Sequence, residues 1–406
     1  DRDLRNRVLA EGLGPDTPVA QVASRPLRTL EARTPLYAAW TWLLEQGVHH
    51  APLTRAGEVV GLLSSGDLMR ASQYGPVALL RRVERLPSRE ALAGYAGQVA
   101  AMAGSLLSGG LEALVIAGLV ARLNDALLRR LLSLAERELG PPPAPYAWLV
   151  LGSEGRMEQT LLTDQDNALV YADAGAAARP WFQALAERMS ADLLAAGFPL
   201  CPGGFMARSW HGTLSEWEAR FGAWADSPQP QALLEAAVFL DFRRAAGALS
   251  LEPLERARTR MRERVPFLRG LARTALDFKP PPLLLLRLRG AQGEVDLKAH
   301  GIVPVVGLAR CYGLEAGGPQ RPTLARLEAA ARAGLTDADG VERVAEAYRF
   351  LLGLRLRLQL RRPDGTGGAR VRLAELTPLE RARLKESLHE VRAFQERAER
   401  HYQVEG

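Results

Sequence analysis

The chain has 406 residues, enough for two or three domains, and its 47% hydrophobic and 24% charged residues are typical of a folded protein rather than a disordered one. Its two cysteines, Cys201 and Cys311, are too few to stabilise a fold of this size by disulfides, so we expect a cytoplasmic protein. No apolar run approaches the roughly 20 residues of a membrane span, so we expect a soluble protein without a membrane anchor. The net charge of +6 suits either nucleic acid or a triphosphate pocket, but the arginines are spread along helical segments, which favours solvated helix faces over nucleic-acid binding.

The first 75 residues predict a small α/β unit. Thr34 and Pro35 open a helix that runs towards Gln46, and two strands joined by a tight turn are expected at 48–53 and 58–63. Ser64 and Asp67 follow the second strand, where their side-chain oxygens can cap the free amides of a new helix.

In this order of elements, residues 1–75 resemble part of a CBS pair, in which two β-α-β-β-α modules together bind an adenine nucleotide. Residues 1–5 align with residues 65–69, so we expect the chain to begin near the end of a first module. The resemblance implies that Ser64 and Asp67 contact the ribose and phosphate of an adenine-nucleotide effector. Helix capping alone is the equal alternative, and pairing of modules between two chains would make a homodimer.

Residues 76–140 predict helices, because apolar residues recur at helical spacing up to the prolines at 141–143. A buried strand is expected at 146–151, and residues 228–406 are expected to be almost entirely helical. The long helices of this last region are predicted at 231–246, 254–276, 323–333, 341–360 and 378–402.

The motifs that carry chemistry begin where the strand at 146–151 ends. Gly152 and Ser153 form a tight bend there, and ten residues separate Ser153 from Asp164, which opens a second expected strand at 164–170. Asp164 and Asp166 would share one face of that strand, because side chains alternate along it. Adjacent carboxylates repel each other unless a cation lies between them, and Mg²⁺ or Mn²⁺ prefers such oxygen ligands. A glycine-serine bend lets backbone amides approach a triphosphate closely, so the pattern predicts a nucleoside triphosphate held for attack at its α-phosphorus.

This arrangement resembles the minimal members of the polymerase-β-like nucleotidyltransferase superfamily. The fuller strings at 152–159 and 163–169 are similar to a narrower bacterial family of nucleotidyltransferases that carry CBS modules and are related to the PII uridylyltransferase. Further stretches continue the likeness over essentially the whole chain, at 201–207, 241–243, 296–298, 303–310 and 376–381.

The resemblance implies a role for each matching residue. Gly152 and Ser153 would hold the triphosphate, and Asp164 and Asp166 would be the catalytic, metal-binding acids. The fold it implies is α/β plus all-α, with three parts: a partial CBS module at 1–75, a helical lead-in and minimal nucleotidyltransferase domain at 76–227, and a helical substrate-binding bundle at 228–406.

For each of two cationic residues, two interpretations remain open. Arg156 either clamps a phosphate through paired hydrogen bonds or forms an ion pair with Glu154 or Glu158. Lys298 either reaches the triphosphate from the helical side or is a solvated lysine.

A third acid is missing from its usual place. Many relatives carry a carboxylate that can act as general base in the stretch corresponding to 198–204, and this chain has none there. Asp241 is the candidate replacement, with pairing to Arg243 or Arg244 as the alternative.

Three functions follow from these observations. The leading hypothesis is transfer of a nucleoside monophosphate from a nucleoside triphosphate to a hydroxyl of a protein or small molecule, as in a uridylyl- or adenylyltransferase. The transfer would depend on Mg²⁺ or Mn²⁺ and would be regulated by an adenine nucleotide at the CBS part. The missing third acid motivates the alternative of a catalytically weak, nucleotide-sensing regulatory protein. A template-independent nucleic-acid polymerase ranks last, because the sequence has no evident array of stacking aromatics along a basic groove.

Overall fold

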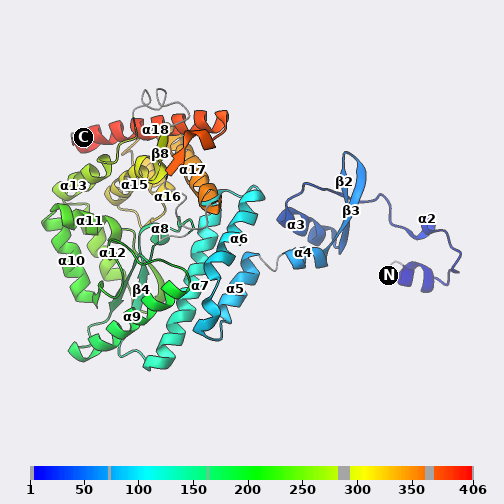
Figure 1. Ribbon diagram of the computed structural model, residues 1–406, viewed down its shortest axis with the longest axis horizontal. Helices are drawn as coiled ribbons and strands as arrows, with labels where there is room; N and C mark the ends of the chain where they lie inside the picture. The colour runs from blue at the N-terminus through cyan, green and yellow to red at the C-terminus, as the bar shows by residue number, and fades with distance from the viewer. Residues whose placement is uncertain (1–3, 72–74, 162–163, 282–292, 362–369, 405–406) are drawn as a thin grey trace. The chain divides into compact units, whose positions relative to one another are not determined.

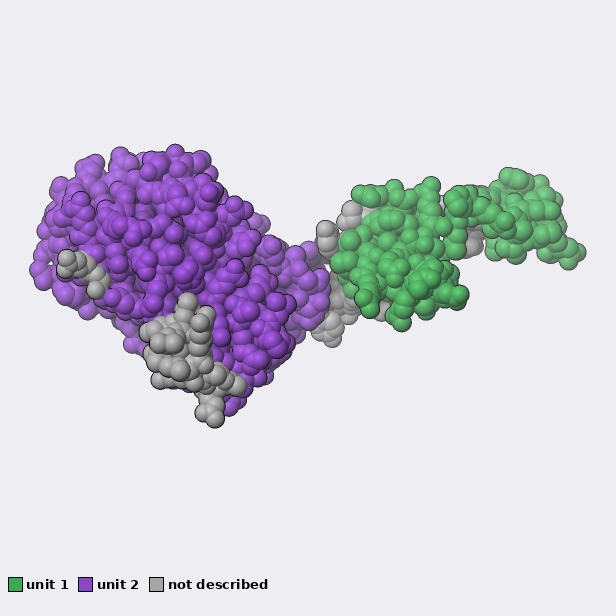
Figure 2. All heavy atoms as spheres, turned by 90° about the horizontal axis from the view of Figure 1, so that it is seen from above, with its two compact units in different colours: residues 1–75 green, residues 76–406 purple. Residues whose placement is uncertain are grey.

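The computed structural model describes residues 4–71, 75–161, 164–281, 293–361 and 370–404. The chain divides into two compact units, residues 1–75 and 76–406, which Figure 2 colours separately. Residues 1–3, on which the expected alignment with 65–69 partly depends, lie outside the described part. None of the described helices combines the length and the apolarity that crossing a membrane requires.

The first unit is built around a three-stranded sheet. Its strands are β1 (Leu30–Glu31), β2 (His50–Arg55) and β3 (Glu58–Ser64), with β1 parallel and β3 antiparallel to the central β2. Helices α3 (Leu36–Gln46) and α4 (Ser65–Ala71) complete it, and the expected helix and both strands occur within two residues of their predicted bounds. The short elements before β1 are η1 (Arg5–Leu9) and α2 (Val19–Val22).

The second unit opens with the helical lead-in that the sequence predicts. Helices α5 (Pro76–Glu84), α6 (Tyr95–Ser108) and the long α7 (Ala113–Leu139) lie together in Figure 1, with the short turn η3 (Arg89–Leu92) between α5 and α6. Helix α7 is buried along most of its length, with residues 123–128 all buried, and it packs against both α5 and α9 (Arg179–Ala195).

The central sheet has four strands in the order β6-β5-β4-β7. They are β4 (Tyr146–Val150), β5 (Asn167–Tyr171), β6 (His211–Thr213) and β7 (Arg243–Gly247), and only the β5–β6 pair is parallel. Every residue of β4 and β5 is buried, so helices cover both faces of the middle of the sheet. Between the strands lie α8 (Gly152–Gly155), η4 (Ala176–Ala178), α9 (Arg179–Ala195), α10 (Leu214–Asp226) and α11 (Pro230–Phe239).

Three expected elements differ from the structure. The strand expected at 164–170 begins only at Asn167, because β4 ends at Val150 and leaves the preceding residues no strand to pair with. The helix expected at 231–246 ends at Phe239, and residues 243–247 instead pair with the open edge of β4 as β7. The helix expected at 254–276 is two helices, α12 (Glu252–Met261) and α13 (Val265–Leu276), because the proline at 266 fits only the first turn of a helix.

The remaining residues form the C-terminal bundle. Helices α16 (Thr323–Arg332), α17 (Ala338–Arg361) and α18 (Pro378–Tyr402) confirm the helices predicted at 323–333, 341–360 and 378–402. A hydrogen-bonded capping box between Thr377 and Glu380 starts α18. The bundle also contains β8 (Glu294–Asp296), η6 (Lys298–Ile302), α15 (Val303–Glu315), β9 (Arg370–Arg372) and η7 (Leu373–Glu375). One continuous cluster of buried apolar side chains joins it to the central sheet.

Candidate active site

A cavity of about 450 Å³ lies where β4 and β5 meet the C-terminal helices. One part of its lining is apolar and comes from α11, α13 and α15, for example Val238, Leu271 and Val306. The other part is charged or polar. Its members are Ser153, Arg156, Asp164, Asp166, Thr274, Lys298, Arg310 and Arg355.

The bend after β4 lies directly against the second aspartate. Gly152 has φ +53°, a left-handed conformation that favours glycine, and a Cβ added to it would lie 3.0 Å from Oδ2 of Asp166. The backbone amide of Leu151 also donates to the carbonyl of Asp166 at 2.9 Å. The glycine-serine bend and the Asp-x-Asp motif are therefore neighbours in space.

Gln165 explains why both aspartates line the same cavity. It is 2% exposed, and its side-chain amide donates to the carbonyls of Ser190 (3.2 Å) and Phe198 (3.0 Å) on the inner side of the chain. Because side chains alternate along an extended segment, fixing Gln165 inward turns Asp164 and Asp166 outward. The alternation expected for a strand thus holds in a segment that precedes the strand.

The surroundings of Asp166 change its pKa. Burial raises the pKa of Asp166, and the charge of Asp164 raises it further, while a hydrogen bond from the Cys201 thiol and the charge of Lys298 act in the opposite direction. A divalent cation between the carboxylates would relieve this repulsion, and carboxylate oxygens are the ligands that Mg²⁺ and Mn²⁺ prefer. The described residues contain no group of three or more His, Cys, Asp and Glu side chains placed to hold a metal. The pair therefore fits a metal whose coordination shell is completed by substrate phosphates and water.

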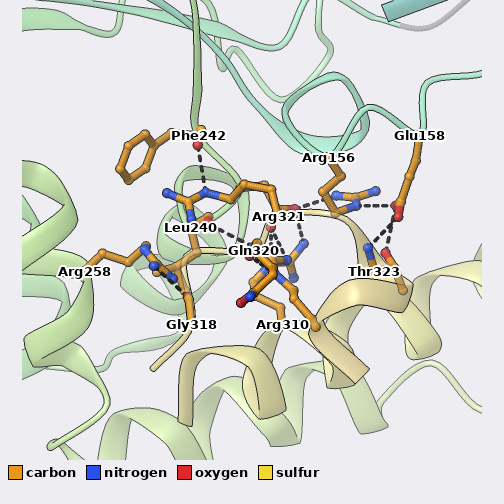
Figure 3. Close-up of polar contacts among 12 residues, drawn as sticks. Arg156, Glu158, Leu240, Phe242, Arg258, Arg310, Gly318, Gln320, Arg321 and Thr323 are labelled. Carbon is orange, nitrogen blue, oxygen red and sulfur yellow. Dashed lines mark hydrogen bonds and ion pairs between the residues drawn. The ribbon is translucent and has the colours of Figure 1, made fainter. Parts of the chain in front are cut away.

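Asp241 lies behind the cavity as the centre of a buried ion-pair network. Its carboxylate, which is 0% exposed, accepts hydrogen bonds from Arg156 (Nη1, 2.5 Å), from Arg310 (Nε, 3.1 Å, and Nη2, 2.7 Å) and from Arg326 (Nη1, 2.6 Å). Figure 3 shows how Arg156 and Arg310 converge from different elements. Burial by itself raises the pKa of Asp241, but the three guanidinium groups hold it well below its usual range. This geometry favours an electrostatic role for Asp241 over that of a general base.

The arginines expected as alternative partners of Asp241 bind elsewhere. Arg243 forms a paired ion bridge to Asp125, at 2.7 and 2.9 Å. Arg244 donates to the carbonyl of Leu249 at 3.0 Å. The pairing of Asp241 with Arg243 or Arg244 is therefore wrong, because β7 carries those two side chains away from the turn that holds Asp241.

Glu158 fixes the other side of the Arg156 guanidinium. It accepts from Arg156 Nε (2.8 Å), from the backbone amide and hydroxyl of Thr323 (2.5 and 2.7 Å) and from the Tyr348 hydroxyl (2.9 Å). Thr323 is the first residue of α16, so Glu158 satisfies free groups at that helix start, as Figure 3 shows. Of the two ion pairs expected for Arg156, the one with Glu158 is present.

Two family models match the chain. The model described as "Putative nucleotidyltransferase DUF294" matches residues 97–231, and the model described as "Putative nucleotidyltransferase substrate binding domain" matches residues 266–402. These matches support a nucleotidyltransferase family. No curated protein matches the chain.

The cavity draws its polar residues from both matched domains. The first matched range contributes Ser153, Arg156, Asp164 and Asp166, and the second contributes Thr274, Lys298, Arg310 and Arg355. A nucleotidyltransferase family implies a nucleoside triphosphate as substrate, and this mixture of acids and cations suits such a ligand.

Sequence reasoning missed the cavity arginines Arg310 and Arg355. Arg310 stands at the end of the similar stretch 303–310, which is a signal that could have singled it out. Arg355 follows a helical pattern of arginines and leucines in α17, and nothing in that pattern distinguishes it from Arg357 or Arg361.

The predicted effector residues lie in the first unit. The Ser64 hydroxyl donates to Oδ2 of Asp67 at 2.6 Å, the Ser64 amide donates to the same oxygen at 2.9 Å, and the Asp67 amide donates to the hydroxyl at 3.1 Å. This is the helix cap expected as the alternative. Contact of the same two residues with an adenine nucleotide stays a prediction.

Proposed function

We propose that the chain transfers a nucleoside monophosphate from a nucleoside triphosphate to an acceptor hydroxyl, with Mg²⁺ or Mn²⁺ bound by Asp164 and Asp166. The observation that carries the proposal is that Ser153, Asp164, Asp166 and Lys298, which come from three separate stretches of sequence, line one cavity.

Each residue would bind or orient one part of the substrate. The Gly152 backbone and the Ser153 hydroxyl would hold phosphate oxygens, and Arg156 would present a guanidinium whose orientation Asp241 and Glu158 fix. A bound divalent ion would neutralise the charge that develops on the phosphates. The acceptor oxygen then forms a bond to the α-phosphorus, the bond to the bridging oxygen breaks, pyrophosphate leaves, and the hydroxyl proton passes to solvent.

The kind of acceptor and the regulation of the transfer are proposed from other features of the chain. The apolar lining from α11, α13 and α15 is suited to the nonpolar part of an acceptor, either a protein side chain or a small molecule. The β-α-β-β-α order of the first unit supports an adenine nucleotide as effector there. Pairing of this unit with the same unit of a second chain would make a homodimer.

The proposal is tested by a turnover assay with each of the four labelled triphosphates, Mg²⁺ or Mn²⁺, and cell extract as the source of acceptor. Asp164→Asn and Asp166→Asn should each lower transfer about a hundredfold or more, because each removes a charge that the reacting phosphates require. The matched control is Asp173→Asn, an exposed aspartate just beyond β5, which should transfer like the wild type. Transfer that survives in both site variants would refute the proposal.

A nucleotide-sensing protein without efficient turnover is the second candidate. It is favoured by one observation: only two carboxylates among the described residues line the cavity, and the third candidate, Asp241, is buried behind it. Tight binding of a triphosphate by the wild type without labelled product from any extract would support this candidate over the enzyme.

A further inference from the structure

Arg355 is a half-buried cation that forms no ion pair with a described residue. It lies on α17 and lines the cavity that contains Asp164 and Asp166. Its Nε atom is buried without a hydrogen-bond partner, and no described residue forms an ion pair with its guanidinium group. Burial lowers the pKa of Arg355, while the charges of Asp296 and Asp164 act in the opposite direction without an ion pair.

The other arginines of the cavity are already engaged. Arg156 and Arg310 share the carboxylate of Asp241, and Arg156 also binds Glu158. Lys298 resembles Arg355 in forming no ion pair with a described residue. The cavity therefore holds two cations, Arg355 and Lys298, that feel the charge of nearby aspartates but form no ion pair with a described residue.

The charge around the cavity favours a polyanionic ligand. Five cations stand in, behind or beside it, against five carboxylates, so a bound divalent ion would leave the positive charge in excess. The cations are Arg156, Lys298, Arg310, Arg326 and Arg355, and the carboxylates are Asp164, Asp166, Asp241, Glu158 and Asp296, whose charge acts on Arg355. An unpaired buried charge is unfavourable, and an anion that enters the cavity offsets it. A triphosphate has the charge and the length to contact several of these groups at once.

We propose that Arg355 binds the phosphate chain of the nucleoside triphosphate. The assignment rests on the proposed function and extends it, because it makes α17 of the substrate-binding domain part of the nucleotide site. The planar guanidinium offers paired N–H donors that match phosphate oxygens. The nucleotidyltransferase domain, through Ser153, and the substrate-binding domain, through Arg355 and Lys298, would thus hold the same ligand.

Calorimetric titration tests the assignment with two probes, each nucleoside triphosphate with Mg²⁺ and inorganic tripolyphosphate with Mg²⁺. Arg355→Gln should weaken the binding of both probes about 10- to 100-fold, the range for losing a hydrogen bond to a charged group. Arg355→Lys should recover part of the loss, because it restores the charge but not the paired donors. The matched control is Arg349→Gln, on an exposed position of the same helix, which should bind both probes like the wild type.

Thermal unfolding without ligand distinguishes binding from a structural role. Arg355→Gln removes a charge whose partial burial no ion pair offsets, so its melting temperature should equal or exceed that of the wild type. A clear fall in melting temperature, or unchanged affinity for both probes, would overturn the assignment while leaving the proposed function intact. A wild-type protein that binds neither probe would overturn the proposed function as well.

Discussion

Replacing Asp241 with asparagine tests whether this residue holds the cavity arginines or acts as a base. The substitution removes the negative charge shared by Arg156, Arg310 and Arg326, and Arg326 is only 2% exposed. Removing one partner of a buried ion pair costs about 3–5 kcal/mol, because a buried charge is left without its counter-charge. We therefore expect the free energy of unfolding of Asp241→Asn to fall by about 3–5 kcal/mol at pH 7.

The lowered pKa of Asp241 also predicts how the free energy of unfolding changes with pH. The pKa of Asp241 is held well below its usual 3.8, so the stability it contributes is fully present above about pH 4 and is lost as the pH falls below that value. The difference between wild type and Asp241→Asn should therefore be constant from neutral pH down to about pH 5 and shrink in stronger acid.

Urea unfolding at pH 7 measures the effect, with Asp226→Asn as the matched control. Asp226 pairs with Arg264 on the surface, where the two side chains are 61% and 54% exposed, so its loss should cost no more than about 1 kcal/mol. The reasoning is refuted if Asp241→Asn keeps wild-type stability and triphosphate affinity and loses turnover alone. That result would identify Asp241 as the missing base.

Two further substitutions probe the surroundings of the site. Gly155→Ala should destabilise the protein by about 1–3 kcal/mol or more in thermal unfolding, because the new Cβ would lie 2.0 Å from the backbone carbonyl oxygen of Asp241. The control is Gly222→Ala, at a helix position with open space around it, which should have little effect. Burial raises the pKa of Glu154 from 4.5 to about 8, so the wild type should lose stability as the pH rises from about 4.5 through 8. Glu154→Gln removes this loss and should gain about 3–5 kcal/mol relative to the wild type between pH 5 and pH 9 in urea unfolding, and parallel pH profiles would contradict the assignment.

The local parts of the site could be predicted from the sequence. The bend at Gly152 and the common direction of Asp164 and Asp166 depend on a left-handed glycine and on the alternation of an extended chain, and both are properties of a few consecutive residues. The spacing between the two motifs sufficed to place them together. The same reasoning placed the start of the strand three residues too early, because strand bounds depend on the length of the neighbour, and β4 ends at Val150.

The long-range parts could not be predicted in this way. Residues 231–246 are rich in alanine and leucine, and their pattern predicts one helix. Residues 243–247 instead form a strand that pairs with the edge of β4. The break between helix and strand creates the turn that holds Asp241, so an error in secondary structure hid the contacts of a site residue. Those contacts reach residues 69 and 85 positions away, a separation at which periodicity carries no information.

Asp241 also links the two matched domains into one structural unit. It lies between the matched ranges 97–231 and 266–402 and inside neither, yet it binds Arg156 from the first and Arg310 and Arg326 from the second. A chain cut at either boundary would leave at least one of these guanidiniums buried without its carboxylate, and Glu158 would lose its bonds to Thr323. The orientation of the cavity cations is therefore a property of the whole unit 76–406, and a triphosphate that contacts both domains would bind a site whose geometry neither domain can maintain alone.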